Sequence, residues 1–370
     1  MKKRLYRKIL KKLLKLFGKD LKGHRLKRVK KLAAMICGLL RKKQPSMKSL
    51  GHGLPQPIQS HSREKSAKAF VDNKWVDYQT FYLPFITSLL TTIFELYPHL
   101  KNDIKLVIDG SKIGKHHMTL MISLVFRGRG IPIVWLVRRK KKGHFDADTH
   151  IELVERAKKI LTPFINDFGV VLLGDGEFGN LKLQKWCISN SWHYVFRIAK
   201  DNHLYDEDNH RFNPTDVQVN DNQQFVSFPN VDCTAERLKD VHFVLWHDEK
   251  YEEPLPLISN LEEPIDIIEA YDIRYSIECL FKDMKSNTFN LHKTRLKSEH
   301  AINNLIMIGA FAISLLFKLG VRYEKSSIRK YIHRIRPDRI VNSLITFAIQ
   351  LIDFFLEEDL DFTFEFSPSP

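Results

Sequence analysis

The stretch YDIRYSIECLFKDMK, residues 271–285, concentrates charged side chains among good helix formers. At 100° per residue, a single carboxylate, Glu278, falls in a stripe about 80° wide that also carries Tyr271, Arg274, Lys282 and Lys285. The apolar residues of the stretch fall on a neighbouring side that can pack on a core. One acid placed among several cations along a helix is an arrangement that a phosphate backbone could follow. Such pairs are also common on solvated helix surfaces, so this stretch alone leaves both interpretations open.

Two aspartates stand where an apolar strand runs into a glycine-containing turn: Asp109 in IKLVIDGSKIG and Asp175 in VVLLGDGEFGN. Polar groups converge on ligands at strand ends of α/β sheets, although a lone Asp after a strand is usually only a turn former. Together with Glu278 they make three carboxylates that suit hard divalent cations. Two ions about 3.5–4 Å apart would activate a water or a 3′-hydroxyl and stabilise the leaving oxygen in phosphodiester chemistry. The cations beside Glu278 would then hold phosphates.

The order of elements predicts an α/β fold with a mixed sheet covered by helices. Strand-like runs at 104–109, 117–126 and 131–139 are followed by alternating helix and strand up to residue 199. Residues 201–264 read as a β-rich insertion, and the charged helix and an apolar helix at 299–319 come next. We therefore expect a helical region at 1–98, a catalytic core at 99–320 and a helical region at 321–370. The acidic tail is expected to be loosely held.

The positive charge of the chain lies at its N-terminal end. The chain has 59 Lys and Arg and 43 Asp and Glu; residues 1–50 hold 19 of the basic residues and one acid, Asp20, which leaves 40 and 42 for the rest. This asymmetry indicates a polyanionic partner, either nucleic acid or an anionic membrane surface. The first helix, residues 6–17, suits either partner.

Cysteine spacing and hydropathy bear on the compartment. Cys37, Cys187, Cys233 and Cys279 are far apart and have no metal-site spacing, which favours a reducing, intracellular compartment. The most apolar segment, Leu305 to Phe317, is about 13 residues long, short of the roughly 20 that span a bilayer. We therefore expect no transmembrane helix.

These motifs resemble a known family. Tyr271, Arg274, Glu278 and Lys285 match Tyr-x2-Arg-x3-Glu-x6-Lys, the signature of bacterial insertion-sequence transposases of family four. Asp109 and Asp175 resemble the two aspartate motifs of that family's DDE triad. The resemblance covers roughly residues 60–320. Given this resemblance, the basic N-terminal helices are better interpreted as binding DNA, and no membrane partner is expected.

The resemblance implies a ribonuclease H-like core with a β-rich insertion, and cleavage and rejoining of DNA at terminal inverted repeats. It implies two Mg²⁺ ions, replaceable by Mn²⁺, on Asp109, Asp175 and Glu278. Tyr271, Arg274 and Lys285, with the neighbouring Lys282, would contact DNA phosphates. It also implies a homodimer on paired transposon ends, in the bacterial cytoplasm at the nucleoid. The helical region at 1–98 would then recognise the element's end.

Some positions depart from this pattern or are ambiguous. Gly176 stands where many relatives carry Arg. Glu177 is a further acid near Asp175, but its direction should differ and a helix N-terminus explains it. Trp246, the only tryptophan in the insertion, could stack on a flipped base, as one does in the family, or simply bury its ring. Rival functions are a nuclease without strand transfer and a catalytically inactive DNA-binding descendant.

Overall fold

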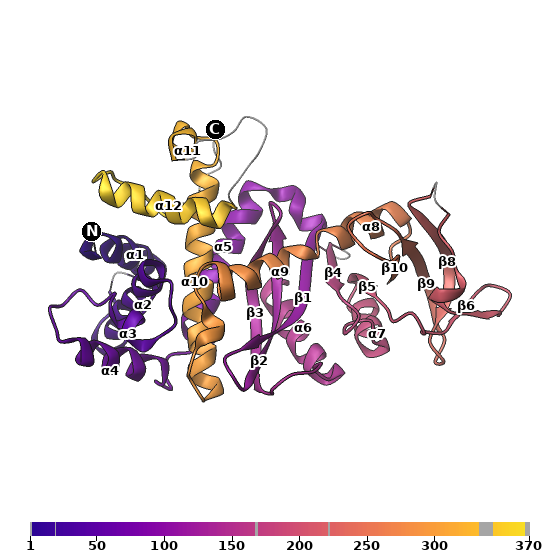
Figure 1. Cartoon of the computed structure of the whole chain (residues 1–370), viewed down its shortest axis with the longest axis horizontal. Helices are drawn as coiled ribbons and strands as arrows, with labels where there is room; N and C mark the ends of the chain where they lie inside the picture. The colour runs from indigo at the N-terminus through magenta and orange to yellow at the C-terminus, as the bar shows by residue number, and fades with distance from the viewer. Residues whose placement is uncertain (1, 19, 167–168, 221–222, 333–342, 367–370) are drawn as a thin grey trace.

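The structure is a computed structural model that describes residues 2–18, 20–166, 169–220, 223–332 and 343–366. The N-terminal helices gather at one end of the molecule, a single sheet runs through its middle, and the last strands of that sheet lie at the other end (Figure 1). The long orange helix, α10, stands between the N-terminal helices and the sheet. The charged stretch therefore lies over the middle of the molecule.

Ten strands of the described chain form one sheet in the order β3-β2-β1-β4-β5-β10-β9-β8-β6-β7. β1 is antiparallel to β2 and parallel to β4, and β4 is parallel to β5. The strands are β1 (Ile104–Ile113), β2 (His117–Phe126), β3 (Arg129–Arg139), β4 (Val170–Gly174), β5 (His193–Arg197), β6 (Leu204–Tyr205), β7 (Arg211–Phe212), β8 (Phe225–Cys233), β9 (Leu238–Trp246) and β10 (Leu255–Ser259). β4 is buried throughout, as a central strand with both faces covered must be.

Helices cover both faces of this sheet. α9 packs on β1, β2 and β3, and α6 packs on β2 and β3 from the other side (Figure 1). The helices are α1 (Lys2–Phe17), α2 (Gly23–Lys42), α3 (Met47–Gly51), α4 (Ser60–Val71), α5 (Leu83–Leu96), α6 (Ala147–Leu161), α7 (Leu181–Ser189), α8 (Pro264–Asp272), α9 (Tyr275–Lys282), α10 (Glu299–Tyr323), α11 (Ser327–Ile332) and α12 (Leu344–Glu357). Short π-helical segments lie at Tyr78–Tyr82 and Asp283–Asn287.

The structure corrects two of the sequence expectations about the site. β1 continues to Ile113, so Asp109 lies within the strand and not at its end. The charged stretch is not one helix, because α8 ends at Asp272 and a tight turn at Ile273 and Arg274 precedes α9. The strands of the β-rich segment extend the central sheet, because β10 pairs with β5.

α10 is the core helix of the molecule. It is 25 residues long and apolar enough to cross a membrane by length and composition, longer than the apolar segment expected from sequence. Its most apolar window is nevertheless entirely buried inside the protein, against α2, α4, α12 and β3. Burial of that kind is what a core helix of a folded domain requires.

The C-terminal segment, residues 358–366, lies along α1 and is not loosely held as expected. Its acidic side chains pair with cations that recur every four residues on α1. The pairs are Arg4 with Asp359, Lys8 with Asp361, and Lys12 with Glu365. Phe362 and Phe364 alternate with these acids and are 2% exposed. The alternation of acid and aromatic residue therefore gives the segment one face toward the lysines and one toward the core.

Candidate active site

The register of the sheet places Asp109 and Asp175 side by side. β1 and β4 are parallel, and the last pair of aligned residues is Val107 with Leu173. Each aspartate stands two residues beyond that pair. Because side chains alternate between the two faces of a sheet, both carboxylates leave the sheet on the same face. α9, which carries Glu278, packs over β1 on that face.

The carboxylates form one electrostatic unit. The pKa of Asp109 is raised to about 7, mainly by burial and then by the negative charge of Asp175, with a smaller contribution from Glu278. The Gly110 amide, which donates a 2.6 Å hydrogen bond to Asp109, and the Arg274 charge act in the opposite direction. Like charges thus crowd at a site that is largely withdrawn from water.

Two cations of the charged stretch reach this unit. Arg274 donates a 2.6 Å hydrogen bond to the Glu278 carboxylate, and its side chain is only 15% exposed. Lys285 donates a 2.6 Å hydrogen bond to the Ser111 hydroxyl. Ser111 lies two residues after Asp109 on β1, so both side chains are on the same face of the sheet. Burial lowers the pKa of Lys285, and the negative charge of Asp109 opposes that shift. Both cations therefore face the carboxylates and not open solvent.

The other predicted DNA contacts are placed differently. Tyr271, at the end of α8, is 3% exposed, and the Arg274 guanidinium lies 5.5 Å from its ring centre. Lys282 is exposed and bonds the Tyr275 hydroxyl. The break between α8 and α9 is the reason that the five polar groups do not follow a single helical stripe.

Trp246 is buried and not presented to solvent. It lies in β9 between Phe225 of β8 and Leu255 of β10, is 4% exposed, and meets the Tyr251 ring edge to face. In this conformation its ring cannot stack on a base. Its ring is instead buried in a short strand, which is the other alternative that the sequence left open.

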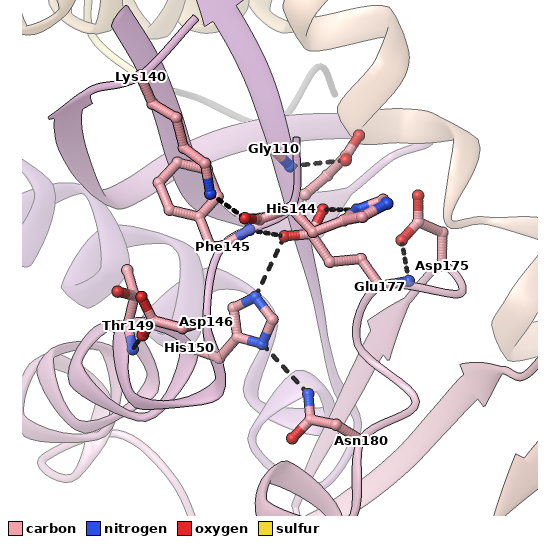
Figure 2. A network of polar contacts seen from close by, with 11 residues as sticks. Gly110, Lys140, His144, Phe145, Asp146, Thr149, His150, Asp175, Glu177 and Asn180 are labelled. Atoms are coloured by element: carbon pink, nitrogen blue, oxygen red, sulfur yellow. Dashed lines mark hydrogen bonds and ion pairs between the residues drawn. The ribbon is translucent and has the colours of Figure 1, made fainter. Parts of the chain in front are cut away.

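Glu177 is the centre of a network that the sequence did not reveal (Figure 2). Its carboxylate accepts hydrogen bonds from the Phe145 amide at 2.5 Å and from His144 Nδ1 at 2.8 Å, and contacts His150 Nε2 at 3.3 Å. Burial raises the pKa of Glu177, but the hydrogen bonds from the two histidines and Phe145 outweigh it and lower the pKa overall.

This network lies on the other face of the sheet from the carboxylates. A side chain at Gly110, which alternates with Asp109 on β1, would meet Phe145 and Glu177. The Glu177 amide nevertheless donates to Asp175 Oδ1 at 3.0 Å, so the network holds the loop that carries Asp175. The different direction expected for Glu177 on a turn or helix start is confirmed, since Glu177 lies in a turn before α7 and not at a helix N-terminus. Its partners His144 and Phe145 come from the loop before α6 and His150 comes from α6, and no spacing in the sequence indicates them.

The donor chemistry suits hard divalent cations, but the geometry is not that of a loaded metal site. Within the residues that the structure describes, no group of three or more His, Cys, Asp or Glu side chains is arranged to hold a metal ion. Glu278 is engaged by Arg274 instead. Asp109, whose pKa is raised by burial and by neighbouring acids, is the kind of group whose ionised form a divalent cation would stabilise. The residues therefore fit an oxygen-ligand cation in their chemistry.

The fold and the site define a chain that gathers acidic side chains on the face of a mixed sheet, beneath a charged helix. Comparison with known families gives the match: residues 91–315, more than half of the chain, match the transposase DDE domain. The chain belongs to this family of DDE transposases. The match includes Asp109, Asp175 and Glu278.

Two further comparisons add little. None of the curated proteins compared with the chain matches it. Among solved structures, the C-terminal lobe of a budding yeast Argonaute aligns over 73% of this chain at 10% identity. The alignment spans 59% of that Argonaute chain, with a TM-score of 0.24, which is too low to carry an argument.

Proposed function

We propose that this chain is the transposase of an insertion sequence of the family-four type, which cleaves at the element's terminal inverted repeats and joins the 3′ ends to target DNA. The observation that carries the proposal is the equivalent position of Asp109 and Asp175 on one face of the sheet, beneath the helix that holds Glu278. The strand order β3-β2-β1-β4-β5, with β1, β4 and β5 parallel, supports a ribonuclease H-like core.

Asp109, Asp175 and Glu278 are the proposed ligands of Mg²⁺, in a two-ion site that also accepts Mn²⁺. Bound there, the ions would supply charge stabilisation to both oxygens of an in-line phosphodiester exchange. The protein contributes a partly desolvated site, in which the Asp109 carboxylate is already made costly by Asp175 and Glu278. The Arg274 guanidinium neutralises Glu278 while the site is free of metal.

The same neighbourhood can hold the DNA backbone. Lys285 stands beside Asp109 on Ser111, and Lys282 is exposed on the outer side of α9. Arg274 can pass from Glu278 to a phosphate once the carboxylate has another partner, and Tyr271 positions that guanidinium with its ring. The region at 1–98 is proposed to hold the transposon end, and two copies of the chain to pair two ends.

An excision assay tests the proposal. A plasmid carries the gene's natural locus with its flanking DNA, and wild-type protein, Glu278→Gln or Glu269→Gln is supplied with Mg²⁺. Glu269 is a matched control, an exposed carboxylate on the adjacent α8. We expect wild type and Glu269→Gln to excise the element and Glu278→Gln to be inactive. Equal excision by all three would remove Glu278 from the chemistry, and cleavage without insertion would identify a nuclease instead.

A further inference from the structure

The N-terminal half of α2 carries a group of cations that differ from those on one face of α1, which acids of the C-terminal segment neutralise. The C-terminal segment occupies Arg4, Lys8 and Lys12. Lys22 immediately precedes α2, and Arg25, Lys27, Arg28 and Lys30 lie in its N-terminal half. All five are exposed except Arg28, which is half-buried. Within the described residues, none of these five makes an ion pair. The C-terminal half of α2, from Leu32 to Leu40, is packed into the core, so the basic N-terminal half is the part presented to solvent.

Trp75 adjoins this basic face. It is 59% exposed, whereas Trp135, Trp192 and Trp246 are each at most 4% exposed and Trp186 is half-buried and hydrogen-bonded to Glu155. The Arg28 guanidinium lies 5.8 Å from the Trp75 ring centre and the Lys74 amine lies 5.3 Å from it. A large apolar ring that stays in solvent between two cations does not contribute the stabilisation that its burial would give.

The loop that presents Trp75 is held firmly. Asn304, which is fully buried on α10, donates to the Val71 carbonyl at 2.9 Å, and His300 contacts the Asn73 carbonyl at 3.0 Å. The Trp75 amide in turn donates to the Asn73 side chain at 2.9 Å. The exposed indole is therefore fixed by the core helix, as a preorganised contact residue should be.

We propose that double-stranded DNA binds across the exposed face of α2, with Arg28 and Lys74 on its phosphates and Trp75 packed against the sugars and bases beside them. The proposal deepens the proposed function, on which it rests for the identity of the ligand as DNA. Guanidinium and amine groups supply the counterion-release part of the affinity. The flat face of an indole contacts nucleotides by stacking and packing, which does not depend on metal or catalysis.

Binding is tested with the full-length chain and short fluorescein-labelled duplexes tiled across the DNA that flanks the gene, without Mg²⁺. Fluorescence anisotropy compares wild type with Trp75→Ala and Arg28→Ala. The controls are Tyr331→Ala, an aromatic residue 74% exposed elsewhere, and Lys239→Ala, an exposed lysine on β9. We expect Trp75→Ala to lose about tenfold in affinity, Arg28→Ala to reduce the slope of log affinity against log salt by about one, and both controls to bind as wild type does.

Intrinsic fluorescence gives an independent result. Unlabelled duplex should quench the emission of wild type, and Trp75→Phe should lose that quenching, because Trp75 is the largely exposed tryptophan among the five. Undiminished quenching in Trp75→Phe, or wild-type affinity in Trp75→Ala, would overturn this inference and leave the proposed chemistry standing. A wild-type chain that binds no duplex would defeat both proposals.

Discussion

Charges meet in two very different ways at the α1 surface and at the candidate active site. Along α1, cations every four residues face acids of the C-terminal segment, and opposite charges pair near solvent. At the site, burial and the negative charges of Asp175 and Glu278 raise the pKa of Asp109, while Arg274 forms its hydrogen bond with Glu278. The charges on α1 are neutralised within the protein, whereas the acidic charge at the candidate active site is not fully neutralised without a ligand.

The comparison distinguishes charges that are paired within the fold, as on α1, from charges that are left for a ligand to neutralise, as at the candidate active site. Exposed ion pairs contribute roughly 0–1 kcal/mol each, so the α1 contact depends mainly on the buried rings of Phe362 and Phe364. Crowded carboxylates in contrast oppose folding, and proteins retain such groups where binding or chemistry uses them. Four substitutions sharpen this comparison.

The largest effect is expected from Asp109→Asn. Loss of a metal ligand should remove several kcal/mol of transition-state stabilisation, which is about a thousandfold or more in cleavage rate. The same change should stabilise the metal-free fold. The pKa of Asp109 rises from 3.8 to about 7 on folding, so the folded state holds a proton that the unfolded state releases between these values. The loss of folding stability caused by the ionised Asp109 carboxylate is therefore absent below about pH 3.8 and complete above about pH 7.

Thermal unfolding in a chelating buffer measures this stabilisation. The gain in Tm of Asp109→Asn over wild type should be larger at pH 8 than at pH 5. Added Mg²⁺ should then raise the Tm of wild type more than that of the variant. A variant that is less stable than wild type at pH 8 would contradict the picture of crowded carboxylates.

A smaller effect is expected where the C-terminal segment docks. Phe364→Ala should cost about 3 kcal/mol, since the ring is buried and leaves a cavity. Glu365→Gln, its neighbour, should cost less than about 1 kcal/mol, because it removes only partly exposed ion pairs to Lys12 and Lys15. Urea unfolding of the two variants compares them directly, and a reversed order would mean that ion pairs hold the segment.

An effect on cleavage smaller than that of Asp109→Asn is expected from Glu177→Gln. This change weakens the bonds to His144 and His150 that hold the loop of Asp175, and an outer partner of a metal ligand is worth about 10- to 100-fold. We expect cleavage to fall by that factor, the Mg²⁺ concentration for half-maximal rate to rise, and DNA affinity to stay constant. Glu155→Gln is the control, since Glu155 is a half-buried acid bonded to Trp186. A loss of DNA affinity in Glu177→Gln would point to a general structural role.

Much of the sheet could be predicted from periodicity. The strand at 117–126 was predicted with the bounds that the structure gives, and the strand predicted at 131–139 agrees with β3 within two residues. These elements carry strong apolar patterns, which report that one face is buried. The same patterns do not say which element covers that face, so the pairing of β10 with β5 could not be predicted.

The site was predictable in its residues more than in its arrangement. Asp109, Asp175 and Glu278 were selected by type and motif, and the register of β1 with β4 relates the first two in space. The break at Ile273 and Arg274 was missed, because both residues keep helical dihedral angles and neither is Gly or Pro. Glu177 and His144 lie in loops and His150 lies on α6, and contacts between such separate segments depend on how the chain folds back and leave no periodic signal.

The contact between α1 and the C-terminal segment also bears on the time course of folding. Arg4 and Asp359 are 355 positions apart, so their pairing closes nearly the longest loop that this sequence allows. Such a closure costs entropy that rises only slowly with length, but it cannot begin before the intervening chain has emerged from the ribosome. While the sheet and α10 are being synthesised, the lysine-bearing face of α1 is therefore not yet covered by this segment.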